Sequence, residues 1–335
     1  MNSTAASLSR WLLTSNLRIR TGPHRGALAG WLDANDSPAF LYPEITGYYL
    51  SWLASVPAPS EEIRSAAIEA IGWFAQIATG GLPLLTRYYP SPNEDDWRNR
   101  AIFTFDLAMA ARGISDARHV SLADDGHAPL QYLLDVLTED CRAGEGLPAY
   151  IRARGALPER WSTRPGPYQL KPAAAILFRV KDAPRELRDA AWNTWDRWWP
   201  VPLEVHEPDD LHPALYALEG LIEAGRCGVS DALELADSRL ADVAEKLPRW
   251  PNDLRSDVVA QTLRLCSVFE SHQHRIAGLR QLLAEFMQND GRVSFKRSGC
   301  SPLHWNAGSA MFAYSGLVTD DAPRTTNGLD RYTGI

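Results

Sequence analysis

One pattern limits the possible folds of this 335-residue chain more than any other: two kinds of helix alternate along it. The first kind is apolar and rich in alanine and glycine, and is expected at 43–54, 100–112, 169–178, 212–224, 255–269 and 305–317. The second kind is amphipathic and more charged, and is expected at 61–78, 129–142, 184–198, 230–247 and 274–288. Counted from Glu44, successive helices of the first kind start 58, 67, 43, 43 and 50 residues apart, a spacing typical of helix-pair repeats.

The composition of the two helix types favours a closed ring over an open solenoid. An open stack of helix pairs needs a polar cap at each end, whereas in a closed ring the last helix packs on the first. Small residues such as Ala174 and Gly308 allow the apolar helices to crowd around an axis. We therefore predict an all-α (α/α)6 toroid of six helical hairpins, a single domain over 1–317 in which a helix at 4–15 closes the ring. Residues 318–335 are expected to form a polar tail, and Gly291–Phe295 is the only short strand candidate.

Charge and composition exclude several classes of protein. A net charge of −7 and a pI near 5.7 argue against a nucleic-acid-binding protein, and no apolar stretch approaches the ~20 residues that span a membrane. Because the N-terminus lacks the pattern of a secretory signal, we expect a cytoplasmic protein. The four scattered cysteines and the absence of metal-binding spacings predict no disulfide and no metal site. The sequence also has no phosphate-binding glycine loop, so no cofactor is expected.

The stretch 42–48 begins an unusual helix. Pro43 suits the first helical position, and Glu44 then lies in the first turn, where the helix dipole favours a negative charge. Gly47 costs about 1 kcal/mol relative to alanine inside a helix, which indicates that another backbone approaches closely there. Glu44, Gly47, Tyr48 and Ser51 share one helical face. This face suits the wall of a site, although a capped helix with its tyrosines in the core would explain it equally well.

In a toroid, the starts of the inner helices and the loops before them line one mouth. Tryptophan stands near nearly every one of these starts, and flat aromatic faces with nearby arginines suit a sugar that carries an acidic group. Alternatively, the tryptophans only cover helix ends. The loop 160–169 is stiffened by Pro165 and Pro167, and either holds Arg164 for an anion or serves as a rigid connector. The expected substrate-binding residues are Trp31, Tyr48, Trp97, Arg98, Trp161, Arg164, Tyr168, Gln169, Arg255, Trp305 and Asn306.

Two catalytic schemes compete for this mouth. Glu44 and Asp257, with Asp106 as a further candidate, could flank a glycosidic bond as acid and base or nucleophile. Alternatively, His212 and His304 could exchange a proton with one carbon of a sugar, as a two-base epimerase requires. Capping roles would explain His212 and Asp257 without any chemistry.

Glu219 lies about 10 Å down its helix by helix rise, and a carboxylate at that depth needs a partner. Arg264 and Lys171 are the candidates for a buried ion pair with it.

Several junctions resemble those of a known group of enzymes. Trp161-Ser-Thr-Arg-Pro-Gly-Pro, His212-Pro-Ala-Leu-Tyr-Ala-Leu-Glu-Gly and His304-Trp-Asn are similar to the loop-to-inner-helix junctions of six-hairpin glycosidases, unsaturated-uronide hydrolases and N-acylglucosamine 2-epimerases. The toroid also resembles terpene cyclases, but the Asp-x-Asp-Asp signature is absent. The resemblance implies a carbohydrate-active enzyme with glycoside hydrolase or lyase-like chemistry on a sugar or sugar conjugate. A sugar epimerase, a non-catalytic binding or scaffold toroid and a terpene-type cyclase remain as alternatives.

Overall fold

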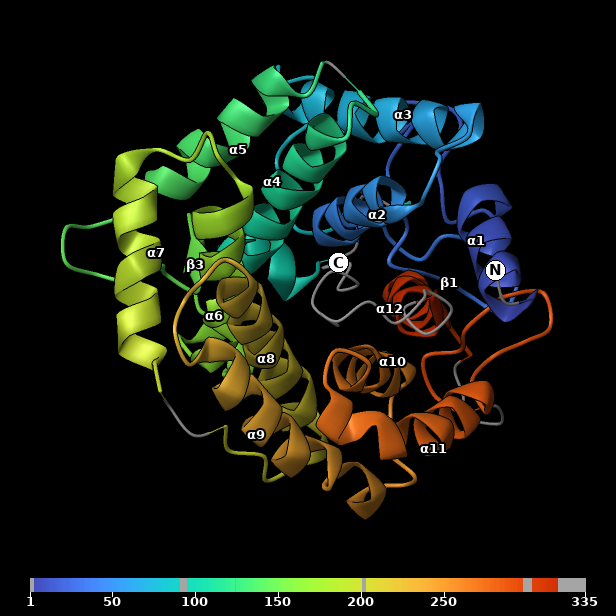
Figure 1. Ribbon diagram of the computed structural model, residues 1–335. Coiled ribbons are helices and arrows are strands. Elements are labelled where there is room, and N and C mark those ends of the chain that lie inside the picture. The colour runs from blue at the N-terminus through green and yellow to red at the C-terminus, as the bar shows by residue number, and fades with distance from the viewer. Residues whose placement is uncertain (1–2, 91–94, 124, 201–202, 298–302, 319–335) are drawn as a thin grey trace.

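The protein is an all-α (α/α)6 toroid, as the sequence predicts (Figure 1). The computed structural model describes residues 3–90, 95–123, 125–200, 203–297 and 303–318, and these residues contain twelve α-helices. The inner ring consists of α2 (Pro43–Ser55), α4 (Thr104–His119), α6 (Leu170–Ala174, continued by a π-helical turn, Ala175–Arg179), α8 (Leu211–Arg226), α10 (Ser256–Cys266) and α12 (Ala307–Val318). The outer ring consists of α1 (Ser3–Thr14), α3 (Glu61–Ala78), α5 (His127–Thr138), α7 (Arg185–Trp198), α9 (Ala232–Ala244) and α11 (Gln273–Ala284).

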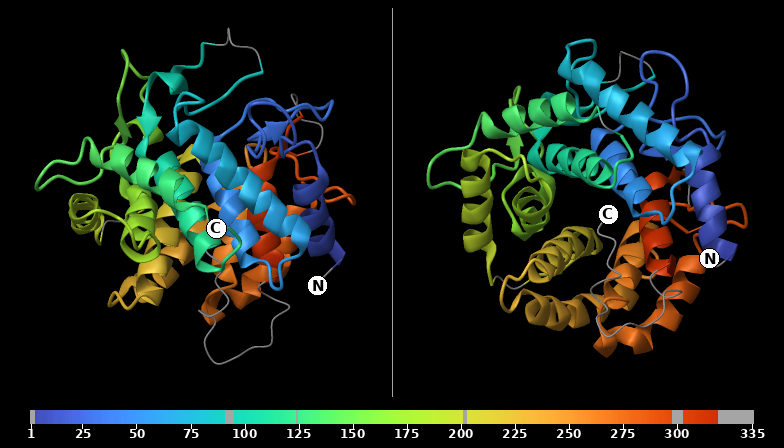
Figure 2. Two further views of the ribbon diagram at one scale, coloured as in Figure 1. Left: turned by 90° about the horizontal axis from the view of Figure 1, so that it is seen from above. Right: turned by 45° about the horizontal axis from the view of Figure 1, so that its top comes forward.

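The last inner helix packs against the first elements of the chain. α12 contacts both α1 and α2, and the tilted view in Figure 2 shows the same ring of helices from another side. Of the predicted tail at 318–335, only Val318 belongs to the described residues, where it is the last residue of α12. The remainder of that prediction lies outside them.

Small residues set how closely the inner helices approach. A Cβ atom added at Gly220 of α8 would lie 2.5 Å from the carbonyl carbon of Leu170 in α6. Ala173 and Ala260 are fully buried on inner helices. The alanine and glycine content that predicted crowding around an axis therefore corresponds to direct contact between helix backbones.

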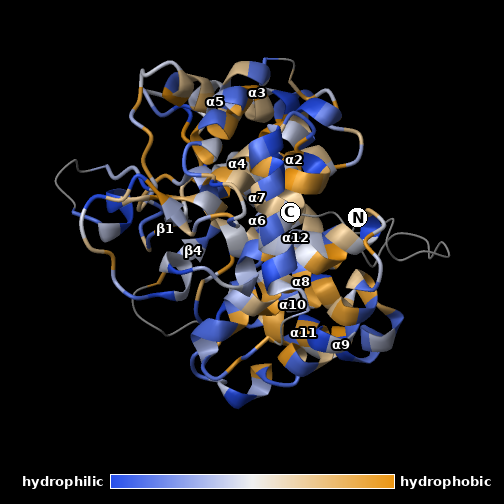
Figure 3. Cartoon of the chain, turned by 90° about the vertical axis from the view of Figure 1, so that its left-hand side faces the viewer, coloured by the Kyte–Doolittle hydropathy of each residue, from blue (hydrophilic) through white to orange (hydrophobic). Residues whose placement is uncertain are grey.

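Short strands replace parts of the predicted helices. β2 (Ile102–Phe103) pairs antiparallel with β3 (Tyr150–Ile151), so the helix predicted from residue 100 begins at Thr104 instead. β1 (Trp31–Leu32) pairs in the same way with β4 (Trp305–Asn306). Within the predicted strand at 291–295, only single bridges form, from Val293 to Met287 and from Ser294 to Trp305. Figure 3 shows β1 and β4 at one end of the helical ring.

Most helices carry both hydrophobic and hydrophilic residues along their length (Figure 3). On α7, for example, Leu187 and Trp195 are buried whereas Arg185 is exposed. Within the described part of the chain, we found no helix with both the length and the apolar character that a membrane crossing requires. The cytoplasmic location expected from the sequence stays a prediction.

Candidate functional site

A cavity of about 420 Å³ opens at the end of the ring where the inner helices begin. The first turns of five inner helices and the turn before α6 each place a residue on its wall. These residues are Glu44 (α2), Asp106 (α4), Tyr168 (before α6), His212 (α8), Asp257 (α10) and Gly308 (α12). The toroid therefore gathers into one cavity residues that are up to 281 positions apart in the sequence, from Trp31 to Phe312.

Two buried carboxyl groups from neighbouring helices face this cavity. Glu44 is the second residue of α2 and Asp106 the third of α4, so both lie in a first helical turn. The hydroxyl of Tyr42 donates to Asp106 Oδ1 at 3.3 Å, and it lies close enough to Glu44 to oppose the rise of the pKa of that carboxyl. Tyr216 donates to Glu44 Oε1 at 3.3 Å. Asp106 Oδ2 is buried and has no hydrogen-bond partner among the described residues.

The surroundings of the two carboxyl groups favour a shared proton. Burial raises the pKa of Glu44, and hydrogen bonds from Tyr42 and the charge of Lys171 oppose that rise. The pKa of Asp106 is raised well above its usual value by burial and then by the negative charge of Glu44. Because two close carboxylates disfavour each other's ionisation, such a pair can hold one proton near neutral pH. Asp106 is the better proton donor of the two and Glu44 the better base.

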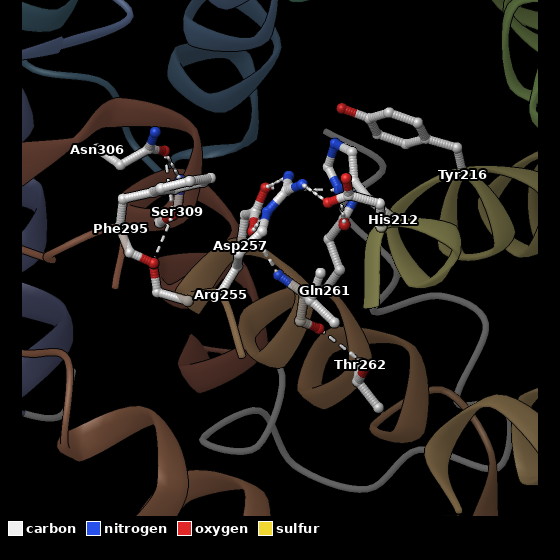
Figure 4. Close-up of polar contacts among 12 residues, drawn as sticks. His212, Tyr216, Arg255, Asp257, Gln261, Thr262, Phe295, Asn306 and Ser309 are labelled. Atoms are coloured by element: carbon white, nitrogen blue, oxygen red, sulfur yellow. Dashed lines mark hydrogen bonds and ion pairs between the residues drawn. The ribbon is translucent and has the colours of Figure 1, made fainter. Parts of the chain in front are cut away.

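A second polar group stands on the wall formed by α8 and α10 (Figure 4). Asp257 accepts hydrogen bonds from Arg255 Nε at 3.0 Å and Nη2 at 2.5 Å, and its oxygen Oδ2 lies 3.5 Å from His212 Nδ1. Burial alone would raise the pKa of Asp257, but the charge of Arg255 outweighs this and holds the pKa below its usual value. Asp257 is therefore a charged, ion-paired carboxylate, unlike Glu44 and Asp106.

The geometry around His212 determines which ring nitrogen carries the proton. Burial lowers the pKa of His212 to about 4, so the imidazole is neutral near pH 7. Its Nδ1 atom lies 2.9 Å from Gln261 Oε1, and Gln261 in turn donates Nε2–H to Glu219 at 3.2 Å. Because Gln261 must present its oxygen to the imidazole, Nδ1 carries the hydrogen and Nε2 keeps a lone pair. His212 is thus a neutral acceptor on the cavity wall.

Aromatic rings and arginines complete the cavity. The Arg87 guanidinium lies 3.9 Å from the centroid of the Phe40 ring and 5.8 Å from that of Trp31. Arg98 lies 4.6 Å from the Trp97 ring. Trp161 packs edge-on against Tyr168, with ring centroids 5.0 Å apart. Flat aromatic faces beside cationic donors are suited to a polyhydroxylated ring that carries an acidic group.

The structure brings most of the predicted site residues together. The members of that set that line the cavity are Glu44, Asp257, His212, Trp31, Tyr48, Trp97, Arg98, Trp161, Tyr168, Arg255 and Asn306.

Four others lie elsewhere, each with another contact. His304 does not line the cavity but stacks on Trp31, which does, with 4.7 Å between the ring centroids. The exposed Arg164 pairs with Glu159 in its own loop. The side chain of Gln169 accepts a hydrogen bond from the Gly166 backbone N–H and donates one to the Leu147 carbonyl oxygen. Trp305 lies beneath the Arg292 guanidinium.

Sequence reasoning overlooked several cavity residues, among them Tyr216 and Arg87. Tyr216 lies one helical turn after His212, so helical spacing alone could have found it. Arg87 lies in a loop with no periodic signal, and only the fold brings it to the cavity. Glu219, by contrast, pairs with both Lys171 and Arg264, which confirms the buried ion pair expected for it.

The same geometry bears on the alternative functions. His212 lines the cavity and His304 does not, so the two-histidine scheme has only one histidine in place. A terpene-type cyclase needs a deep apolar cavity. The wall of this cavity instead carries three carboxyl groups and four arginines, namely Glu44, Asp106, Asp257, Arg87, Arg98, Arg160 and Arg255. Among the described residues, no group of three His, Cys, Asp or Glu side chains is placed to hold a metal ion.

Solved structures with the same architecture are known. An unsaturated glucuronyl hydrolase from Bacillus sp. GL1, responsible for degrading glycosaminoglycan, matches with a TM-score of 0.63 and 12% identity over 95% of this chain and 94% of that chain. An unsaturated glucuronyl hydrolase specific for heparin matches with a TM-score of 0.57 and 11% identity over 98% of this chain and 95% of that one. A family 76 glycoside hydrolase from a bovine Bacteroides thetaiotaomicron strain matches with a TM-score of 0.60 and 12% identity over 95% of this chain and 77% of that chain.

The likeness lies in the fold. The chain has the six-hairpin toroid architecture of these glycosidases. By sequence, no protein-family model and no curated protein matches it. At 11–12% identity, the chemistry of this chain has to be argued from its own cavity.

Proposed function

We propose that this protein is a carbohydrate-active enzyme that cleaves a glycosidic bond in the toroid mouth, with Glu44 and Asp106 as its acid–base pair. The observation that carries this proposal is the pair of buried carboxyl groups on adjacent inner helices, both facing one cavity, with the hydroxyl of Tyr42 hydrogen-bonded to Asp106. Asp257, the second acid expected from the sequence, is tied to Arg255 and is the weaker candidate for proton transfer.

The two groups divide the reaction by their protonation. Asp106 gives its proton to the oxygen of the leaving sugar as the bond from that oxygen to the anomeric carbon breaks. Glu44, as the carboxylate, either attacks that carbon or takes a proton from the water that does so. Tyr216 holds Glu44 through the hydrogen bond to Oε1. After hydrolysis the proton taken up by Glu44 has to return to Asp106, and the hydroxyl of Tyr42, which donates to Asp106 and lowers the pKa of Glu44, offers a route for it.

The cavity also suggests the class of sugar. Trp31, Trp97 and Trp161 offer flat faces on the wall, and Arg87 and Arg98 stand beside two of them. An acidic group on the sugar would be placed beside these arginines, in keeping with the uronide substrates of two of the structural neighbours. We therefore expect acidic glycosides, saturated or unsaturated, to be turned over in preference to neutral ones.

The test compares acidic and neutral glycosides on the wild type and on Glu44→Gln and Asp106→Asn. Removing a catalytic acid or base that contributes ~10²–10⁴-fold should reduce kcat by that factor with little change in binding. Asp253→Asn, a change at an exposed residue of the chain, is the matched control and should keep full activity. Turnover that both cavity variants retain would exclude the assignment, and so would the absence of turnover on every glycoside tried.

One observation favours a second chemistry. His212 is neutral and has a free Nε2 lone pair on the cavity wall, so it could remove a proton from a sugar carbon next to a carboxyl group. With Asp106 as the acid, this arrangement would support a lyase or an epimerase. His212→Asn should then abolish activity, whereas in the hydrolase it should mainly weaken substrate binding. Incorporation of solvent deuterium at a sugar carbon would identify this second chemistry directly.

A further inference from the structure

A buried lysine lies directly beneath the floor of the cavity. The rings of Tyr48, Phe105, Tyr216 and Phe312 line the cavity, and the Nζ atom of Lys171 lies 4.4, 6.0, 4.5 and 5.5 Å from their respective centroids. The lysine itself is only 2% exposed and does not line the cavity. It can therefore affect a bound ligand only through the residues above it.

Two tyrosine hydroxyls, those of Tyr48 and Tyr216, stand between this lysine and Glu44. Lys171 Nζ donates to the Tyr48 hydroxyl at 2.9 Å. The hydroxyls of Tyr48 and Tyr216 lie close enough together for each to alter the pKa of the other. Tyr216 then donates to Glu44 Oε1 at 3.3 Å. This path spans three inner helices, α6, α2 and α8, and ends on the carboxylate assigned above as the base.

The lysine is held in place from its other side. Glu219 of α8 pairs with Lys171 and also with Arg264 of α10. The charged and titratable groups around Lys171 are Glu44 and Tyr48 from α2, Arg112 from α4, His212, Tyr216 and Glu219 from α8, and Arg264 from α10. Lys171 and Arg264 share the charge of Glu219, and the charge of Lys171 also acts on Glu44, where it opposes the rise of the carboxyl pKa.

We propose that Lys171 is a positioning residue that sets the protonation of Glu44 through the hydroxyls of Tyr48 and Tyr216. In this exchange a hydrogen leaves Lys171 Nζ for the Tyr48 oxygen, the Tyr48 hydrogen moves to the Tyr216 oxygen, and the Tyr216 hydrogen is transferred to Glu44 Oε1. Lys171 is then a neutral amine and Glu44 a carboxylic acid, and the reverse sequence restores both. No other reactant is consumed. This role rests on the proposed function of Glu44, but the path through the two hydroxyls can be tested without turnover.

Burial makes such an exchange accessible near neutral pH. It lowers the pKa of Lys171 to about 7, although the charge of Glu219 opposes the shift. The pKa of Glu44 is raised by burial at the other end of the path. The two groups are thus closer in proton affinity than an exposed lysine and an exposed glutamate, so that a proton can move between them at modest cost.

The test follows the titration of Glu44 in the intact protein by infrared difference spectroscopy. The carboxyl band of Glu44 is identified as the one lost in Glu44→Gln. Lys171→Met removes the positive charge, so the midpoint of this band should move to higher pH by about one unit or more. Tyr48→Phe keeps the ammonium but breaks the path, and should move the midpoint in the same direction by a smaller amount.

Two matched variants separate this effect from general disturbance. Lys181→Met removes an exposed lysine, and Tyr49→Phe removes the hydroxyl of the neighbouring buried tyrosine. Neither should move the midpoint. An unchanged midpoint in folded Tyr48→Phe would overturn the proposal, even if Lys171→Met shifts it, because the lysine would then act by charge alone. If Lys171→Met does not fold, the midpoint of the Glu44 band in Tyr48→Phe alone decides for or against the proposal.

The titration also keeps the two proposals distinct. A shifted Glu44 midpoint without turnover of any glycoside would support the path through the two hydroxyls and reject the hydrolase. Where turnover is found, the limb of the kcat/KM pH profile that belongs to Glu44 should move with the infrared midpoint in both variants. Loss of activity without that movement would indicate a merely structural lysine and would count against the proposal.

Discussion

Gly47 of α2 and Gly113 of α4 lie against each other where the two helices cross. A Cβ atom built on Gly113 would stand 2.1 Å from the carbonyl oxygen of Gly47, and one built on Gly47 would stand 2.5 Å from that of Met109. The close approach of another backbone expected at Gly47 is therefore present. It brings together the first turns of the two helices, which carry Glu44 and Asp106.

We expect Gly47→Ala to destabilise the protein by roughly 1–3 kcal/mol, because the added methyl group has no space between the two backbones. Gly72→Ala is the matched control, since Gly72 lies in α3 and a Cβ there would meet nothing within 4 Å. That change should stabilise by up to ~1 kcal/mol through helix propensity. Urea unfolding measures both. Equal stability of the two variants would show that the helices can separate at no cost.

The fold was predictable because its determinants are local. Alternation of small-residue and charged helices is visible in the sequence, and α3 has the predicted bounds of 61–78. The start of α4 was misplaced because residues 102–103 pair with 150–151, a contact that no local pattern encodes. Helix ends that depend on distant pairing are accordingly the part of the fold that sequence reasoning missed.

The candidate site was predictable to the extent that it lies at helix starts. Glu44, His212 and Asp257 occupy first turns, and the toroid necessarily directs these to one mouth. Arg164 was misjudged because an arginine in a stiff loop can bind an anion or, as here, Glu159 of the same loop. The sequence named Asp106, but only the structure shows that the hydroxyl of Tyr42 donates to it.

Asp106→Asn should make the protein more stable at neutral pH. The pKa of this buried carboxyl is raised, so between its usual value and the raised one the native state keeps a proton that the unfolded state releases. Stability contributed by this group is therefore lost as pH rises through that window. Asparagine has no such dependence. We expect the Tm of the variant to exceed that of the wild type near neutral pH, and the gap to shrink near pH ~4.

Thermal unfolding over this pH range, followed by circular dichroism, measures the effect. The control is Asp253→Asn, at an exposed position. Its Tm should differ from that of the wild type by the same amount at every pH. A variant less stable than the wild type near neutral pH would mean that Asp106 is ionised and held by a partner in the native state.

His212 should make the protein sensitive to mild acid. Its pKa is about 4 in the folded protein and about 6.5 when unfolded, so the unfolded state binds more protons between these values. Stability is therefore lost as pH falls from about 6.5 to about 4. His212→Asn should remove about 3 kcal/mol of this loss, measured as the difference from wild type in urea titrations. The control is His206→Asn, a histidine with a 78% exposed side chain. Parallel pH curves for wild type and His212→Asn would contradict the buried, neutral imidazole.

Glu219 holds two cations at the centre of the ring, and its loss should be costly. Its carboxylate pairs with Lys171 and Arg264, and all three side chains are at most 2% exposed. Glu219→Gln removes the carboxylate that Lys171 and Arg264 share, and with it the charge that opposes the lowering of the Lys171 pKa. Breaking this buried ion pair should destabilise the protein by ~3–5 kcal/mol. Glu159→Gln breaks the exposed pair with Arg164 and should change stability little.

A double variant separates charge from packing at this position. If the cost of Glu219→Gln comes from unmatched charge, adding Lys171→Met should recover part of the lost stability, because one of the two buried basic groups that Glu219 pairs with is then gone. The three urea midpoints form a double-mutant cycle with the wild type, in which a coupling of ~0.5–3 kcal/mol is expected for contacting residues. Additive losses would instead show that the two side chains contribute by filling space, and that the field of Lys171 is not balanced by Glu219.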